Sequence, residues 1–427
     1  MNQEKIVWKL FGKKLVSYKK TDDGEFKGNG LLNPIVDRFG LITMLIGQSK
    51  FYKNYKGYTY WKGYRVANSF APPVGSGPMY RAIKQMLKGR LLRHVSPMAM
   101  TYAVSYNCQC SCVHCSAGKH KKMDMKELST EEAKKLIDDS QKLGISILAF
   151  TGGEPLLRKD IFDLISYVNK EKTLPIMFTN GQYLTEENVE KLIEADLYCL
   201  FVSIDSPIPD HHDTLRGMPG LFEDALGGIK RMIQKGGLVG LSSYATRSAT
   251  EQGMYKKLYD LGKDLGVHNI ILFDGVPTGN ILKDTSEMLT DDQREEIRQF
   301  STNIFKNSIF PPLSSQCWQN SIEAFLGGIG CLAANIQYYV SAYGEVSPCD
   351  FSPLSFGNIR EEPLKEIWNK MVHHPAFKRR SSVCRMQNNK FRHFYIDPIP
   401  DDAKLPYDIN KLPAVDYRKE AIDQITI

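Results

Sequence analysis

The sequence predicts an α/β protein whose core is a partial (β/α)6 TIM-type barrel. Between Met98 and about Ser308, short apolar runs alternate six times with amphipathic stretches. Strands that alternate with helices in this way lie parallel and are joined by right-handed crossovers. Polar and glycine-rich segments follow these apolar runs. They are expected to form the loops at the carboxyl ends of the strands, where such folds place their chemistry.

Six strands and six helices are expected in alternation. The strands are predicted at Met100–Ser105, Ile147–Thr151, Ile176–Thr179, Leu200–Asp205, Leu238–Tyr244 and Asn269–Asp274. The helices are predicted at Glu131–Leu143, Ile161–Lys170, Glu186–Ala195, Leu221–Lys235, Tyr255–Leu265 and Asp291–Asn307. The first helix has the clearest boundaries, because Ser129-Thr130-Glu131-Glu132 reads as a capping box and Gly144 follows the last turn.

Four regions divide the 427 residues. An N-terminal extension is predicted over residues 1–96, the barrel over 97–308, a cysteine-containing domain over 309–400 and a tail over 401–427. Within the extension, Lys50–Val66 interleaves aromatic and basic residues, and Met79–Arg93 has a basic amphipathic pattern. The preferred interpretation is that both segments pack as a cap on the barrel. The alternative is that they lie on an anionic membrane surface.

The overall composition is that of an ordinary globular protein. The net charge of +7 favours anionic partners, but it falls far short of a nucleic-acid-binding signature. The longest apolar run, Gly40–Gly47, is too short to span a bilayer, and the N-terminus does not resemble a signal peptide. A cytoplasmic location is therefore expected. Cysteines stay reduced there, so clustering of the nine cysteines points to metal rather than to disulfides.

Three cysteines follow the first predicted strand in the spacing Cys108-x3-Cys112-x2-Cys115. Three thiolates on one loop can hold three irons of a 4Fe-4S cluster and leave the fourth iron open to another ligand. The alternative is structural zinc, with Cys110 or His114 as fourth ligand. The crowding of five candidate ligands and the missing pairwise Cys-x2-Cys repeat favour the cluster.

This cysteine spacing after the first strand of a repeating βα unit resembles the signature of the radical S-adenosylmethionine (SAM) superfamily. The resemblance places His114 beside the adenine of SAM. It assigns the loop after the second strand to the amino group of the methionine portion. That loop contains Gly152, Gly153, Glu154 and Pro155.

Later strand-end loops resemble the same family less specifically. Ser203 and Asp205 match a position that contacts the ribose and carboxylate of SAM, and Arg247 is the expected partner of the SAM carboxylate. Thr179-Asn180-Gly181 is expected to face the same pocket, and Gly275–Gly279 is expected to lie beside the adenine. His212–Phe222 resembles a segment that the family uses beside the fourth strand, and a structural role is preferred over acid–base catalysis for its His212 and Asp213.

A second group of cysteines lies beyond the barrel, at Cys317, Cys331, Cys349 and Cys384. The stretches Gly330-Cys331, Tyr343–Cys349, Phe356–Ile359 and Glu366–Trp368 resemble the SPASM/Twitch extension. That resemblance implies one auxiliary 4Fe-4S cluster in the shorter, Twitch-like form, with these four cysteines as metal ligands. Cys199, within the fourth strand, is expected to be a buried structural thiol.

The resemblance implies reductive cleavage of SAM to methionine and a 5'-deoxyadenosyl radical, which takes hydrogen from an organic substrate. A one-electron donor such as flavodoxin or ferredoxin is expected as partner. The substrate class stays open at this point. Oxidative or bond-forming modification of a peptide or small metabolite is preferred, and a membrane lipid or a tetrapyrrole is the alternative. A non-catalytic zinc-binding or iron–sulfur protein is the alternative from another class.

Overall fold

The structure, a computed structural model, describes residues 4–10, 13–20, 26–28, 56–73, 75–92, 95–120, 124–319 and 330–420. Its centre is an open nine-stranded sheet with the order β12-β11-β10-β9-β8-β7-β6-β13-β14, and neighbouring strands are parallel from β12 to β13. The strands are β6 (Ala99–Ser105), β7 (Ile147–Gly152), β8 (Leu174–Thr179), β9 (Cys199–Ser203), β10 (Val239–Ala245), β11 (Asn269–Asp274), β12 (Leu313–Ser315), β13 (Gln337–Val340) and β14 (Val346–Ser347).

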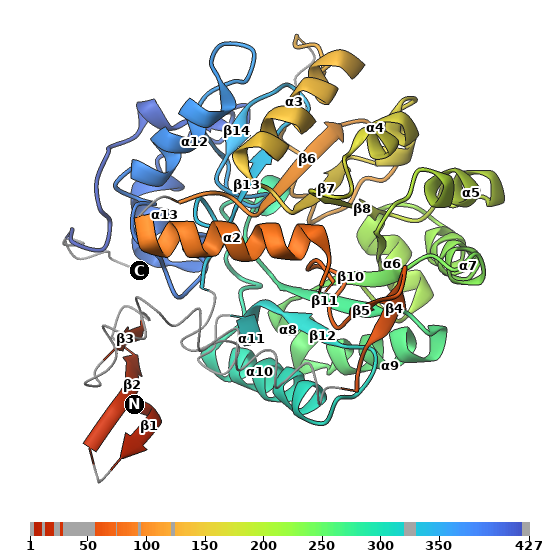
Figure 1. Ribbon diagram of the computed structural model, residues 1–427, viewed down its shortest axis with the longest axis horizontal. Coiled ribbons are helices and arrows are strands. Elements are labelled where there is room, and N and C mark those ends of the chain that lie inside the picture. Colours follow the sequence, from red (N-terminus) through yellow and green to blue (C-terminus); the bar gives the residue numbers. More distant parts are fainter. Residues whose placement is uncertain are drawn as a thin grey trace.

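The helices follow the strands in chain order and lie around the outside of the sheet (Figure 1). They are α3 (Thr130–Leu143), α4 (Ile161–Tyr167), α5 (Glu186–Glu194), α6 (Pro209–Arg216), α7 (Leu221–Gln234), α8 (Arg247–Glu251), α9 (Met254–Leu265) and α10 (Asp291–Lys306). All six predicted strands and all six predicted helices are present, and the α/β prediction is confirmed.

Local chemistry explains the helix boundaries. Both halves of the capping box at Ser129 and Glu132 form, so α3 begins where it was predicted. The helix α4 ends three residues earlier than predicted, because Val168 is extended (ψ 125°). The ammonium of Lys170 then donates to the carbonyls of Ile165 and Ser166 in the last turn, at 2.6 and 2.9 Å.

The strands are buried on both faces, as expected for a parallel sheet covered on each side. In β9, Leu200 and Val202 belong to the main core beneath the helices. Cys199 and Phe201 belong to a separate apolar cluster on the opposite face. Cys199 is fully buried, and burial raises the pKa of its thiol to about 12, which confirms the expected structural thiol.

Residues 59–71 of the N-terminal extension pack on this second apolar cluster. The strands β4 (Thr59–Trp61) and β5 (Tyr64–Val66) form a hairpin, and Val66 is buried in the cluster. The ring of Trp61 lies edge-on to Tyr198, with centroids 5.0 Å apart. The Tyr198 hydroxyl donates to the carbonyl of Ala71 at 3.0 Å. These contacts favour the cap interpretation for residues 59–71, whereas residues 50–55 of the aromatic–basic segment lie outside the described residues.

Two further elements belong to the extension. One is an antiparallel sheet of β1 (Glu4–Leu10), β2 (Lys13–Lys20) and β3 (Phe26–Gly28). The other is α2 (Gly77–Leu92), whose Arg81 donates to the carbonyl of Gln141 on α3. Among the described helices, none combines the length and the apolar character needed to cross a membrane.

The C-terminal region joins the sheet directly, since β13 pairs with β6 and β14 pairs with β13. Its other elements are α11 (Gln316–Gln319), α12 (Leu364–His373), α13 (Asn389–Tyr395), β15 (Leu354–Ser355) and β16 (Tyr407–Asp408). The indole of the buried Trp368 donates to the carbonyl of Val95 at 2.8 Å and ties α12 to the chain that enters β6. The sheet also extends past residue 308 through β12. The division at residue 309 therefore stays a prediction.

Candidate active site

The loop that carries Cys108, Cys112 and Cys115 leaves the carboxyl end of β6. Loops from two other strands hold it in place. The backbone N–H groups of Ser111 and Val113 donate to the carbonyls of Arg216 and Leu215, at 3.0 and 3.1 Å. Asn280, in the loop after β11, donates two hydrogen bonds to carbonyls of the cysteine loop. Its backbone N–H donates to the carbonyl of Cys115 (3.0 Å), and its side-chain amide donates to the carbonyl of Cys112 (3.1 Å). The three predicted ligands therefore lie on one loop that the barrel fixes from two sides.

The thiols of this loop interact with one another. Hydrogen bonding from Cys110 lowers the pKa of Cys108 to about 7 and that of Cys112 to about 6. The pKa of Cys110 is correspondingly raised, and burial raises the pKa of Cys115. Cys110 is half-buried between its neighbours, which differs from the surface thiol expected from the sequence.

The donor set of this loop fits an iron–sulfur cluster. Thiolates are the form that binds soft metal centres, and two of the three predicted ligands already have lowered thiol pKa values. Within the described residues, no three cysteine, histidine or carboxylate side chains already stand at metal-ligand spacing. The assignment of the three ligands therefore rests on the chemistry and spacing of the donors and stays a prediction.

The loop after β7 packs directly against the residues that precede Cys108. The backbone N–H of Gly153 donates to the carbonyl of Ser105 at 2.7 Å, and that of Glu154 donates to the carbonyl of Asn107 at 2.8 Å. A Cβ on Gly152 would lie 2.1 Å from the Ser105 carbonyl oxygen, and one on Gly153 would lie 2.2 Å from that of Asn107. The two glycines are therefore needed for contact between two protein loops.

Glu154 joins this loop to the loop after β8. Its buried carboxylate accepts from the backbone N–H of Leu156 (3.1 Å) and of Asn180 (2.9 Å), and from the hydroxyl of Thr179 (2.8 Å). The amide nitrogen of Asn180 in turn lies 3.5 Å from the sulfur of Cys110. Burial raises the pKa of Glu154, and the hydrogen bonds oppose that shift. The carboxylate thus holds two strand-end loops together beside the cysteine loop, and a role of the loop toward the methionine portion of SAM stays a prediction.

Replacing Gly152 by alanine is expected to destabilise the protein strongly. Gly152 has φ +134°, and the added methyl group would meet backbone rather than a side chain that can move. We expect a loss of about 3 kcal/mol in the free energy of unfolding. Gly236→Ala is the matched control. Gly236 also has positive φ (+79°), but nothing lies within 4 Å of its Cβ position, and a loss of about 1 kcal/mol is expected. Urea unfolding followed by circular dichroism measures both, and equal losses would contradict the packing argument.

Asp205 is the centre of a buried polar cluster at the same end of the sheet. One carboxylate oxygen lies 2.5 Å from Nε of Arg216 and 3.1 Å from Nε2 of His114. The hydroxyl of Tyr244, near the end of β10, lies 2.9 Å from Nδ1 of His114. A guanidinium nitrogen of Arg216 lies 4.0 Å from the sulfur of Cys112. This cluster therefore connects the loop after β9 to the predicted iron ligands.

Electrostatic interactions keep Asp205 and Arg216 ionised. Burial alone would raise the pKa of Asp205, but the charge of Arg216 and the hydrogen bonds from His114 and Arg216 hold that pKa well below its usual range. Burial would lower the pKa of Arg216, and Asp205 and Cys112 raise it instead. The pair is therefore a permanent buried ion pair beside the cysteine loop.

The segment after β9 has a structural role, as preferred from the sequence. Nδ1 of His212 accepts from the backbone N–H of Asp205 at 3.1 Å, so the ring supports the loop from behind. The carboxylate of Asp213 accepts from the backbone N–H groups of Gly220 and Phe222, at 2.5 and 2.9 Å, and fixes the start of α7. Arg216, from the same segment, was not predicted as a site residue.

The remaining predicted SAM contacts lie at the same end of the sheet. Ser203 is the last residue of β9. Arg247 is the first residue of α8, and its Nε donates to the carbonyl of Met288 at 3.1 Å. In the loop after β11, a Cβ on Gly279 would lie 2.1 Å from the carbonyl oxygen of Cys115. The roles of Ser203 and Arg247 toward SAM stay predictions.

A second candidate metal site lies in the C-terminal region. Cys331, Cys349 and Cys384 line one small cavity. Burial raises the pKa of Cys349 and of Cys384, the latter to about 12. Cys317 does not line this cavity, and its thiol donates to Oδ1 of Asp274 at 3.2 Å. The structure therefore brings three of the four predicted auxiliary ligands together and leaves the fourth in α11, in contact with Asp274 of β11.

Two buried polar atoms belong to residues that line this cavity and lack hydrogen-bond partners. The hydroxyl of Ser352 and Nη1 of Arg385 belong to buried residues that line the cavity, and neither has a hydrogen-bond partner. Buried donors without partners are rare in folded proteins. Three soft ligands and two spare donors fit an iron–sulfur cluster, whose sulfurs accept hydrogen bonds.

Two family profiles match the sequence. The Radical SAM superfamily profile matches residues 102–246, and the SPASM profile, an iron–sulfur cluster-binding domain, matches residues 331–390. These spans contain the two cysteine sites described above.

Individual proteins match over longer spans. The AdoMet-dependent heme synthase of Methanosarcina barkeri is 32% identical over 64% of this chain and 82% of that protein. The Fe-coproporphyrin III synthase of the same organism is 29% identical over 64% of this chain and 73% of that protein. Among solved structures, SuiB of Streptococcus suis bound to precursor peptide SuiA has a TM-score of 0.52 and 14% identity over 83% of this chain and 84% of that chain, which shows the shared fold.

Proposed function

This chain belongs to the radical SAM superfamily, and from that membership we propose that it oxidises carboxylate side chains of an iron porphyrin. As a radical SAM enzyme it requires a 4Fe-4S cluster and SAM, and its SPASM domain binds auxiliary iron–sulfur clusters. The observation that carries the substrate class is the 32% identity to a heme synthase over 82% of that protein's length.

The proposed reaction balances as an oxidative decarboxylation. SAM bound at the cluster supplies, after one-electron reduction, a 5'-deoxyadenosyl radical. One hydrogen atom passes from the carbon β to a propionate carboxylate to that radical and gives 5'-deoxyadenosine. The bond to the carboxylate then breaks, carbon dioxide leaves, and a vinyl group forms. One electron must leave the substrate at this step, and an auxiliary cluster in the three-cysteine cavity is the proposed acceptor.

The residues of this chain would hold and shield the reacting groups. Cys108, Cys112 and Cys115 would hold the SAM-binding cluster. The buried Asp205–Arg216 pair and His114 would order the ribose side of the pocket, and the loops held by Glu154 would order the methionine side. Cys331, Cys349 and Cys384 would hold the auxiliary cluster. A flavodoxin- or ferredoxin-type protein is the proposed one-electron donor.

The sequence-based alternative was a membrane lipid or a tetrapyrrole, and the heme and coproporphyrin synthase relatives support a tetrapyrrole over a lipid, a peptide or a small metabolite. The peptide-bound SuiB supports the fold alone, since its identity is 14%. Peptide modification is the second candidate. Conversion of a porphyrin in the following assay would favour the first candidate, and the absence of any altered porphyrin would favour the second.

Anaerobic turnover tests the proposed function. The cluster-loaded protein is incubated with SAM, dithionite and iron coproporphyrin III, and products are separated by chromatography with mass detection. We expect heme, with two equivalents of 5'-deoxyadenosine for the two vinyl groups formed. Metal-free coproporphyrin III is the matched control for recognition of the iron. Formation of 5'-deoxyadenosine at the same rate with and without porphyrin, and with no altered porphyrin, would contradict the proposal.

A further inference from the structure

We propose that Arg385 donates a hydrogen bond to the auxiliary cluster and raises its reduction potential. The inference rests on the proposed function only in giving that cluster the role of electron acceptor. It concerns one residue that lines the cavity of Cys331, Cys349 and Cys384.

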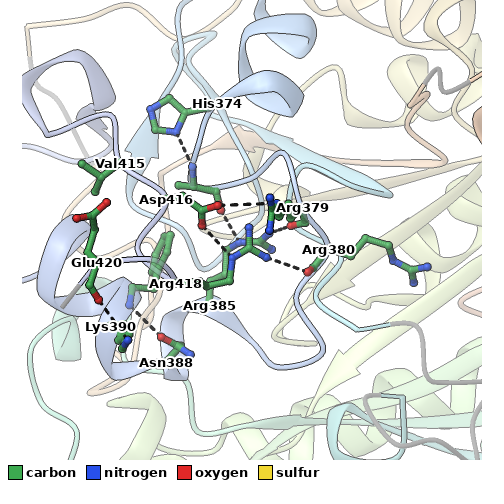
Figure 2. A network of polar contacts seen from close by, with 12 residues as sticks. His374, Arg379, Arg380, Arg385, Asn388, Lys390, Val415, Asp416, Arg418 and Glu420 are labelled. Atoms are coloured by element: carbon green, nitrogen blue, oxygen red, sulfur yellow. Dashed lines mark hydrogen bonds and ion pairs between the residues drawn. The ribbon is translucent and has the colours of Figure 1, made fainter. Parts of the chain in front are cut away.

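The guanidinium of Arg385 is fixed by the protein on two of its nitrogens. It is 2% exposed, Nε donates to the carbonyl of Ala376 at 3.0 Å, and Nη2 donates to the carbonyl of Arg379 at 2.6 Å (Figure 2). Its plane lies over the ring of Phe377, which lines the same cavity, at 5.0 Å from the ring centroid. The third nitrogen, Nη1, has no hydrogen-bond partner. Because the guanidinium is rigid and planar, fixing two nitrogens also fixes the direction of the third.

The charge of Arg385 also lacks a carboxylate partner among the described residues. The nearby Asp416 carboxylate pairs instead with Arg418 at 3.0 Å and Arg379 at 3.9 Å (Figure 2). An arginine stays protonated even when buried, and a buried charge without a counter-charge destabilises a protein strongly. Three cysteines line the same cavity, and cluster binding deprotonates them. The thiolates and the cluster would therefore supply the negative charge that the guanidinium lacks.

The same interaction has a redox consequence. Reduction adds a negative charge to the cluster, so a nearby cation and hydrogen-bond donor stabilise the reduced form more than the oxidised form. Arg385 would thereby make the auxiliary cluster a better acceptor for the electron that leaves the substrate.

Arg392 provides a matched control. It is also a buried arginine, at 4% exposed, and it donates to the carbonyls of Met386 (3.2 Å) and Leu282 (2.7 Å). It does not line the cavity, and none of its nitrogens is among the buried atoms that lack a partner. Arg392→Lys therefore tests the general effect of altering a buried arginine in this region.

Redox titration of the cluster-loaded enzyme, followed by electron paramagnetic resonance, tests the proposal. The auxiliary signal is the one that does not change when SAM is added. In Arg385→Gln we expect at least a tenfold fall in the equilibrium constant for reduction of this cluster, which is about 59 mV for one electron. Arg385→Lys should recover part of the shift because it keeps the charge, and Arg392→Lys should leave the potential unchanged. An unchanged potential in Arg385→Gln overturns the proposal.

A measurement on the native sequence keeps the test decisive if Arg385→Gln does not load a cluster. Protein labelled with ¹⁵N in its arginine guanidinium groups should show a ¹⁵N coupling to the reduced auxiliary cluster by electron–nuclear double resonance. Absence of that coupling overturns the proposal. Neither measurement uses SAM turnover or porphyrin, so its failure is distinct from a failure of the proposed function.

Discussion

Replacing Cys112 by alanine is expected to abolish SAM cleavage and to remove one of two clusters. A 4Fe-4S cluster with only two cysteine ligands left is not retained, and its SAM-binding iron is lost with it, so 5'-deoxyadenosine should fall to background. Iron should fall from about eight to about four per chain, because the auxiliary site is separate. Anaerobic reconstitution, iron and sulfide analysis, and chromatography for 5'-deoxyadenosine measure both changes.

Two controls assign the ligands. Cys110→Ala alters a thiol that lies between Cys108 and Cys112 but falls outside the predicted ligand set, so it should keep both clusters and SAM cleavage. Cys349→Ala should lose about four irons while SAM cleavage without substrate continues. Loss of SAM cleavage in Cys110→Ala, with retention in Cys112→Ala, would show that the loop uses a different set of ligands.

The barrel could be predicted closely because its signals are local. Each strand is a short apolar run, and each helix carries a cap or an amphipathic period, as at Ser129 and Glu132. The cysteine loop and the glycine-containing loop were also identified, since their spacing is specific. The missed elements include the ten-residue helix α12 and the shortest strands of the central sheet. The two-residue strand β14 and the three-residue strand β12 have too few residues for a periodic pattern, and pairing in the sheet defines them.

The site was predicted less completely, because its polar cluster depends on contacts between distant residues. Arg216 reaches Asp205 from eleven residues along the chain, and Tyr244 reaches His114 across 130 residues. One signal in the sequence could have identified Arg216. It is a cation in a segment that follows the end of a strand, and the three cysteine thiolates expected at that end of the sheet are anionic partners for it. The stretches that resemble the SPASM/Twitch extension contain Cys331 and Cys349 but neither Cys317 nor Cys384. Only the fold shows that Cys384 lines the cavity and that Cys317 contacts Asp274.

Breaking the Asp205–Arg216 pair is expected to cost more stability than breaking any exposed ion pair on this protein. Arg216→Met leaves a carboxylate that is 2% exposed without its strongest partner, and Asp205→Asn leaves a buried guanidinium without its counter-charge. Each change should lower the free energy of unfolding by about 3–5 kcal/mol. Anaerobic urea unfolding of the cluster-loaded protein, followed by circular dichroism, measures the loss.

The exposed pair Lys135–Asp139, at 2.7 Å on α3, is the matched control, and Lys135→Met should cost no more than about 0.5 kcal/mol. The double variant Asp205→Asn/Arg216→Met should be less destabilised than the sum of the two single variants, because it leaves no unpaired charge. Strict additivity, or a loss in Arg216→Met as small as that in Lys135→Met, would mean that solvent reaches the pair. The polar cluster of Asp205, Arg216 and His114 would then not be a water-excluded, permanently charged side of the proposed SAM pocket.

If the coupling is found, the same ion pair that orders the loop after β9 also fixes a positive charge 4.0 Å from a predicted iron ligand. In that case the stability of the fold and the electrostatics of the first cluster depend on the same two side chains.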